Sequence, residues 1–307
     1  MSSPTPDPLN DPSKRKAVIA ALILVVVAIA ALLGVKAEWP NDGPVTQPTP
    51  TPSVTPTTAS PTTASPTPVP LRPSWQTTGS PVVTFSDEFN DTVVDPKKWE
   101  KGWFGEGLTQ PTGAGADHCY HSDQVSESGG YLHLLTIAKA NFCRDATRPY
   151  QTGMVTTRGK FSQRTGMFEA RVCVNDLNGD GQVDNWPAFW ANGMASGFQD
   201  GEIDLLEGLG GRTKNSVHYV QANGTLFRGG QYTPTAMLGC HNWGAEYRGN
   251  EVVFYVDGVK RWTHEFITVA NAQLVLILNQ AVDADNGPVY VPAAGSDLKV
   301  DWVRAWN

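Results

Sequence analysis

Residues 201–208 read Gly-Glu-Ile-Asp-Leu-Leu-Glu-Gly and place three acids in one short, otherwise apolar segment. Side chains alternate between the two faces of a β-strand, so Glu202 and Asp204 share a face, whereas Glu207 would point into the core. Burying an unpaired glutamate is costly. A β-bulge, one extra residue at Leu205–Leu206, restores the phase. The segment therefore predicts a bulged strand with three carboxyl groups on one face.

The spacing of these acids suits cleavage of a glycosidic bond. Apart from the bulge residue, Glu202 and Glu207 are four strand steps apart, about 13 Å between backbones at ~3.3 Å per step. Retaining glycosidases need carboxyl groups only about 5–5.5 Å apart, so the two side chains must lean together over a concave sheet. Repulsion keeps at least one acid protonated. We expect Glu202 to be the nucleophile, Glu207 the acid/base and Asp204 the hydrogen-bond partner of the nucleophile; the competing interpretation is a solvated acidic face.

The sequence around the acidic segment predicts many more strands. Residues 166–174 (GMFEARVCV) alternate, and one face carries Phe168, Ala170, Val172 and Val174. Asp257-Gly258 lies between two apolar runs, which is a strong hairpin signal. Residues 274–278 form an apolar run of strand length, and residues 298–306 alternate again. Short strands separated by Gly, Asp and Asn predict an all-β, two-sheet antiparallel sandwich.

Taken together, these segments resemble glycoside hydrolase family 16 in its laminarinase-like, bulged form. The family pattern E-x-D-x-x-E matches Glu202, Asp204 and Glu207 without departure. Five further segments resemble other strands of the family in the same order: FSDEFN (85–90), YQTGMVTTRGKFSQRTGMFEARV (150–172), NWPAFW (185–190), FYVDG (254–258) and VDWVRAW (300–306). The resemblance implies a concanavalin-like jelly roll, a retaining mechanism and an endo-acting cleft.

Two tryptophans and a histidine are the candidate substrate-binding residues. Trp186 and Trp190 are four residues apart and therefore share a strand face, and aromatic rings stack on the apolar faces of sugars. Core packing is the competing use for either tryptophan. The resemblance favours subsite walls. His218 is expected near the acids, with a purely structural histidine as the alternative.

Residues 176–184 read DLNGDGQVD and match most of an EF-type calcium loop. The oxygen-bearing side chains at loop positions one, three, five and nine are Asp176, Asn178, Asp180 and Asp184. Position twelve is Pro187, so the usual bidentate carboxylate is missing. The alternatives are a calcium site and a plain Asp/Gly turn.

The family resemblance implies a second, structural calcium on the convex side. Its ligands would be the Asp301 carboxylate, the Gly130 carbonyl and Glu88. No cofactor is expected for catalysis.

The N-terminal quarter predicts export from the cytoplasm. Residues 14–16 are basic, and residues 17–35 contain no charged or strongly polar side chain. About 19 residues suffice for a membrane helix, although small residues near 35–37 also allow a cleaved signal segment. We expect residues 1–16 to be cytoplasmic and residues 36–75, rich in Pro and Thr, to form a disordered linker. The catalytic domain, residues 76–307, would then be extracellular, either tethered or secreted.

Four cysteines lie in the exported part, so two disulfides are expected. Three pairings are possible, and we expect Cys119 with Cys143 and Cys173 with Cys240. A zinc site at His118, Cys119 and His121 is the rival, but HCYH lacks the paired spacing of zinc motifs. The net charge of −7 and the lack of a basic stripe argue against a nucleic-acid partner.

The first functional hypothesis is endo-hydrolysis of a β-1,3-glucan or mixed β-1,3/1,4-glucan by a monomer. A cell-envelope transglycosylase would use the same acids with a sugar as acceptor. A carbohydrate-binding module without catalysis is the third hypothesis, which the retained acids disfavour. Residues 281–290 (AVDADNGPVY) do not resemble the tryptophan-containing loop of laminarinases, so the linkage specificity stays open.

Overall fold

The computed structural model describes residues 72–307, apart from 104, 114, 194–197 and 267–271. The predicted cytoplasmic segment, the membrane or signal segment and all but the last residues of the linker lie outside these residues. In the described part of the chain, no helix combines the length and apolar character that crossing a bilayer requires.

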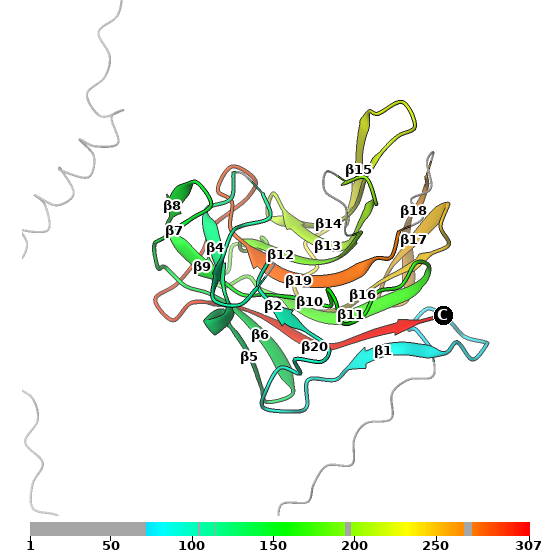
Figure 1. Ribbon diagram of the computed structural model, residues 1–307, viewed down its shortest axis with the longest axis horizontal. Helices are drawn as coiled ribbons and strands as arrows, with labels where there is room; N and C mark the ends of the chain where they lie inside the picture. The colour runs from blue at the N-terminus through cyan, green and yellow to red at the C-terminus, as the bar shows by residue number, and fades with distance from the viewer. Residues whose placement is uncertain (1–71, 104, 114, 194–197, 267–271) are drawn as a thin grey trace, which may run out of the picture. The chain divides into compact units, whose positions relative to one another are not determined.

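Two antiparallel sheets make up most of the described domain (Figure 1). The first has the order β18-β17-β16-β11-β20-β6-β5, with β1 paired to β20. Its strands are β1 (Val83–Asp87), β5 (Val125–Ser128), β6 (Tyr131–Thr136), β11 (Gly166–Val174), β16 (Gly239–Tyr247), β17 (Glu251–Val256), β18 (Val259–Glu265) and β20 (Ser296–Trp306).

The second sheet has the order β15-β14-β13-β12-β19-β10-β2. It contains β2 (Glu100–Lys101), β10 (Met154–Thr156), β12 (Trp186–Asn192), β13 (Glu202–Leu209), β14 (Arg212–Val220), β15 (Leu226–Tyr232) and β19 (Val275–Ala281). The all-β sandwich prediction is confirmed, and the arrangement is consistent with a jelly roll.

Two small sheets and one 3-10 turn complete the described part. They comprise β3 (Leu108–Thr109), β4 (His118–His121) and β9 (Tyr150–Thr152), then β7 (Asn141–Cys143) with β8 (Ala146–Arg148), and η2 (Ser122–Gln124). Strands β4 and β9 are parallel, which alternation along the sequence could not indicate.

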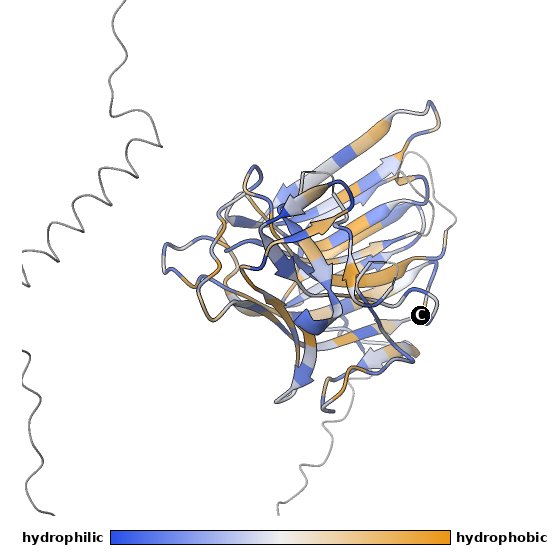
Figure 2. Cartoon of the chain, turned by 60° about the vertical axis from the view of Figure 1, so that its left-hand side comes forward, coloured by the Kyte–Doolittle hydropathy of each residue, from blue (hydrophilic) through white to orange (hydrophobic). Residues whose placement is uncertain are grey.

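The hydrophobic core lies between the two large sheets. Hydrophobic and hydrophilic residues alternate along many strands in Figure 2, as a sandwich requires. The predicted inward face of β11 is buried as expected, with Phe168, Ala170 and Val172 at 0% exposure. The predicted hairpin between β17 and β18 is also present, because Asp257 (φ 51°) and Gly258 (φ 75°) both take the left-handed conformation of a tight two-residue turn.

Both expected disulfides are present, Cys119–Cys143 and Cys173–Cys240. The first joins β4 to the end of β7, and the second links β11 to β16. Cys119 is therefore not available as a zinc ligand, which rules out the rival HCYH site.

The described domain begins packing inside the range predicted as linker. Trp75 stacks on Tyr255 of β17, with ring centroids 4.4 Å apart and planes 2° apart. The backbone N–H of Ser74 donates to Glu169 of β11. Gly244 leaves the space for the Trp75 ring, since a Cβ there would lie 2.1 Å from it. Ser74 and Trp75 therefore pack against the described domain.

Candidate active site

Strand β13 contains the β-bulge that its sequence predicts. On the neighbouring strand β12, Ala188 pairs with Glu207 and Trp190 pairs with Asp204, and the register shifts between the two pairs. The pairing of β13 with β14 shifts in the same interval. Leu205–Leu206 are fully buried in the core between the sheets. The extra residue thus sends both leucines inward while the acids stay on the opposite face.

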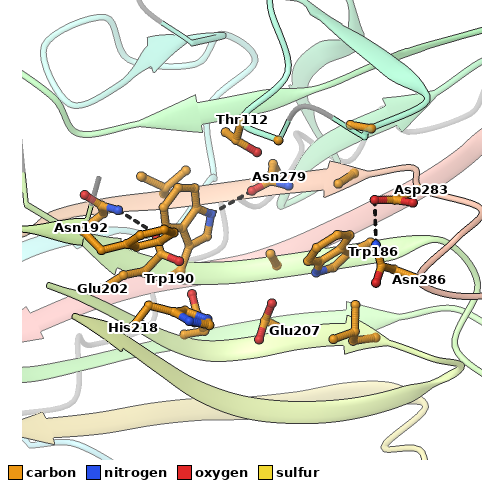
Figure 3. Close-up of a pocket in the computed structure, with 18 of the residues that line it drawn as sticks. Thr112, Trp186, Trp190, Asn192, Glu202, Glu207, His218, Asn279, Asp283 and Asn286 are labelled. Carbon is orange, nitrogen blue, oxygen red and sulfur yellow. Dashed lines mark hydrogen bonds and ion pairs between the residues drawn. The ribbon is translucent and has the colours of Figure 1, made fainter. Parts of the chain in front are cut away.

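All three acids line a single cleft of about 1090 Å³. Its lining comes mainly from β12, β13, β14 and β19, which are neighbours in the second sheet, with further residues from the edge strand β15. Figure 3 shows Glu202 and Glu207 pointing into the same space, on the side of the cleft where His218 also lies.

The two glutamates have different polar partners. Asn192 donates to Glu202 Oε2 at 2.5 Å, a contact that stabilises the ionised carboxylate. Ser216 donates to Glu207 Oε2, and the ammonium group of Lys214 lies 4.0 Å from the same oxygen. Each glutamate is therefore held by side chains from a neighbouring strand.

Asp204 lies between the glutamates and is the most buried of the three acids, at 3% exposure. Its Oδ2 atom lies 3.3 Å from Nε2 of His218. Burial, followed by the charge of Glu207, raises the pKa of Asp204 well above its ordinary value. Burial also lowers the pKa of His218, which favours a neutral imidazole.

Burial is also the main reason that the pKa of Glu202 rises to about 8, and the charge of Asp204 raises it further. Burial and charge repulsion both disfavour the state in which Glu202 and Asp204 are ionised at the same time. A proton on Asp204 would remove the charge that adds to the rise in the pKa of Glu202.

The two predicted aromatic walls differ in their surroundings. Trp190 is only 7% exposed, donates its indole N–H to Asn279 at 2.8 Å and stacks on Trp103 at 6.0 Å. It lines the cleft with a small part of its surface, and the rest is packed against other side chains. Trp186 is half-buried and faces the open part of the cleft beside Asn286 (Figure 3).

Several residues that line the cleft or hydrogen-bond its acids were not predicted from the sequence. Lys214 and Ser216 precede His218 on β14 with period two, so extending the alternation back from His218 would have found them. Asn192 and Asn279 come from β12 and β19, and no local pattern marks either asparagine.

The convex residues predicted as calcium ligands do not fit a cation. Glu88 receives two hydrogen bonds from Arg304, at 2.8 and 2.6 Å. Asp301 pairs with Arg171 at 3.2 Å. Both carboxylates therefore already face a guanidinium group, and the structure gives the predicted Gly130 site no support.

The spacing of acidic groups elsewhere also bears on metal binding. Among the described residues, one group of three His, Cys, Asp or Glu side chains has its ligand atoms within 4.8 Å of one another: Glu202, Asp204 and His218. The acids of the 176–184 loop do not meet that spacing, and they instead accept hydrogen bonds from the loop backbone.

A sandwich whose bulged strand presents three carboxyl groups to an aromatic-lined cleft defines the class as a glycosidic-bond hydrolase. The sequence model of glycosyl hydrolases family 16 matches residues 113–273, just over half of the chain. The chain belongs to glycoside hydrolase family 16, and it is by class an O-glycosyl hydrolase.

Curated relatives are similar over most of the described domain. An endo-1,3-1,4-beta-glycanase, EglC, from Rhizobium meliloti is 26% identical over 73% of this chain and 51% of its own length. A beta-glucanase from Rhodothermus marinus is 28% identical over 76% of this chain and 86% of its own length. The chain thus spans about half the length of the first curated relatives that it matches.

Solved structures share the fold at lower identity. LamAcat from Zobellia galactanivorans has a TM-score of 0.60 at 23% identity, covering 73% of this chain and 97% of that chain. An endo-beta-1,3-glucanase from Pyrococcus furiosus has a TM-score of 0.59 at 21% identity, covering 73% and 94%.

Proposed function

We propose that this chain is a retaining, endo-acting hydrolase of β-1,3-glucan or mixed β-1,3/1,4-glucan. The observation that carries the proposal is that the bulge in β13 presents Glu202, Asp204 and Glu207 to one cleft. The names of the relatives support the glucan as substrate, and the cleft, which continues past the acids, supports endo attack.

The proposed reaction is a double displacement. Glu202 attacks the anomeric carbon while Glu207 protonates the leaving glycosidic oxygen, so a glycosyl ester forms and the C–O bond breaks. Glu207, now ionised, takes a proton from water, which attacks the same carbon and releases Glu202. Retention of configuration follows from the two inversions.

The neighbouring residues are assigned supporting roles. The Asn192 hydrogen bond favours the ionised form of Glu202, which the attack requires. We assign a proton to Asp204, whose pKa is raised, because this removes the charge that adds to the effect of burial on the pKa of Glu202. A protonated Asp204 would donate to the nucleophile and orient it.

The proposal places the domain outside the cytoplasm. The basic residues 14–16 and the apolar residues 17–35 support either a tether or a signal segment. The two disulfides support an oxidising compartment. The domain is expected to act as a monomer on polysaccharide.

The test is hydrolysis of laminarin and lichenan, with reducing ends and product length as readouts. Glu202→Gln should lose essentially all turnover, while Glu265→Gln, an exposed glutamate on β18, should keep it. Proton NMR of the first product should show the β-anomer. Undiminished turnover in Glu202→Gln would remove the proposal, and products longer than the substrate would show transfer to sugar instead of water.

A further inference from the structure

The loop between β11 and β12 contains a buried oxygen that the described residues leave without a partner. Asp184 is 1% exposed, and its Oδ2 accepts a hydrogen bond from the backbone of Leu177. Its Oδ1 atom is also buried and has no hydrogen-bond partner in the described part of the chain. An unpaired buried carboxylate oxygen is costly, so this position calls for a ligand.

The same carboxylate lies near two other acids of the loop. Burial is the main reason that the pKa of Asp184 is raised, and the charges of Asp176 and Asp180 raise it further. No ion pair joins any of these three acids to a Lys or Arg of the described residues. A bound cation would offset this repulsion.

The loop backbone is already wrapped around these oxygens. Asp176 Oδ1 accepts from Gly179 at 2.7 Å and from Asp180 at 3.0 Å, and its Oδ2 accepts from Gly181 at 2.9 Å. Gly179 and Gly181 have φ values of 75° and 80°, which only glycine adopts readily. The turn therefore fixes the Asp176 carboxylate against the loop backbone, and a bound ion would draw the other acids of the loop, whose oxygens do not yet all lie within 4.8 Å of one another, toward it.

We propose that this loop binds one calcium ion. The ligands are side-chain oxygens of loop positions one, three, five and nine and the backbone carbonyl of position seven: Asp176, Asn178, Asp180, Asp184 and Gln182. Calcium accepts such oxygen donors in flexible geometry, whereas Mg²⁺ requires a stricter octahedron. The loop lacks a carboxylate at position twelve, so the affinity should be in the range of extracellular modules, on the order of 10⁻⁴–10⁻³ M.

The site is directly connected to the cleft. Asp184 is followed by Asn185, whose side chain donates to Tyr290 O at 3.0 Å and to Ser296 at 3.1 Å. The next residue is Trp186, which begins β12 and faces the cleft. Val183, on the other side of Asp184, is fully buried and bonds the backbone of Gly211 beyond β13. Calcium would therefore fix the segment that positions Trp186.

The test is calorimetric titration of the full chain with calcium and, separately, with magnesium. We expect one calcium per chain, little heat from magnesium, and a melting temperature about 3–5 °C higher at roughly tenfold the Kd than in EDTA. Asp184→Asn keeps the size and the Leu177 hydrogen bond but removes the charge, and should weaken binding at least about tenfold. Asp123→Asn, an exposed acid in η2, is the matched control and should bind normally.

Absence of calcium heat up to about 10 mM would overturn the inference, since that concentration exceeds the expected Kd range. Undiminished binding by Asp184→Asn would also overturn it, because the ion would then lie elsewhere, for example at the acids of β13. These measurements need no turnover, so they succeed or fail separately from the proposed hydrolysis.

Discussion

Replacing Glu202 with Gln should stabilise the protein at alkaline pH while abolishing turnover. In the folded state, burial and the charge of Asp204 raise the pKa of Glu202 from 4.5 to about 8. The folded protein thus holds this proton more tightly than the unfolded chain does. The corresponding stability is complete below pH 4.5 and is lost as pH rises through about 8. Glutamine does not ionise and avoids that loss.

The size of the effect follows from the pKa change. A rise from 4.5 to about 8 corresponds to at most about 5 kcal/mol, at about 1.4 kcal/mol for each tenfold change in proton affinity. Part of that rise comes from the charge of Asp204 and is lost when Asp204 holds a proton, so we expect a gain of about 2–4 kcal/mol at pH 9 and almost none at pH 4.

Urea unfolding of both proteins at pH 4, 6, 7.5 and 9, with the disulfides intact, measures this difference directly. Glu265→Gln controls for the loss of one negative charge at an exposed position and should change the unfolding free energy by less than about 0.5 kcal/mol at every pH. A Glu202→Gln variant that is no more stable than the parent at pH 9, or equally stabilised at pH 4, would refute the reasoning.

Three further outcomes are expected. Replacing Cys173 and Cys240 by Ser should lower the unfolding free energy by about 4 kcal/mol, because their disulfide closes a loop with a sequence separation of 67 residues. Denaturant unfolding of variant and parent measures this difference, and a loss below about 1 kcal/mol would contradict the prediction. Trp75→Ala should cost about 1–2 kcal/mol by removing an aromatic stack, with kcat/KM unchanged because that contact lies on the sheet without the cleft. In a variant whose loop calcium site has been removed, EDTA should leave the melting temperature unchanged, since Glu88 and Asp301 already hold arginines; a drop would show calcium there.

Local alternation was sufficient to predict the sandwich and the geometry of its acids. The bulge in β13 follows from parity alone, because a strand that buries Leu205 and Leu206 and exposes Glu202 and Glu207 requires one extra residue. The Asp257-Gly258 hairpin follows likewise from turn chemistry.

The features that sequence reasoning missed depend on contacts between distant segments. In the sequence, Trp75 stands at the end of a polar linker. In the structure it packs on Tyr255 and beside Gly244, which lie far from it in the sequence. Trp190 has the spacing of a sugar platform, yet most of its surface is packed against other side chains, Trp103 and Asn279 among them. The periodicity of the sequence does not indicate which strands become neighbours in the sheets.

The extra residue in the bulge of β13 also determines which single insertions and deletions this strand can tolerate. Removing one residue between Asp204 and Glu207 would give a regular strand that still shows three acids to the sugar, so a deletion there preserves the side on which each carboxylate lies. Adding a residue would also keep the three acids on one face of a regular strand, but it would place the last glutamate six strand steps from Glu202, about 20 Å between backbones at ~3.3 Å per step, which is too far for the pair to act together. Single deletions and single insertions at this point are therefore expected to have opposite fates in natural and engineered variants.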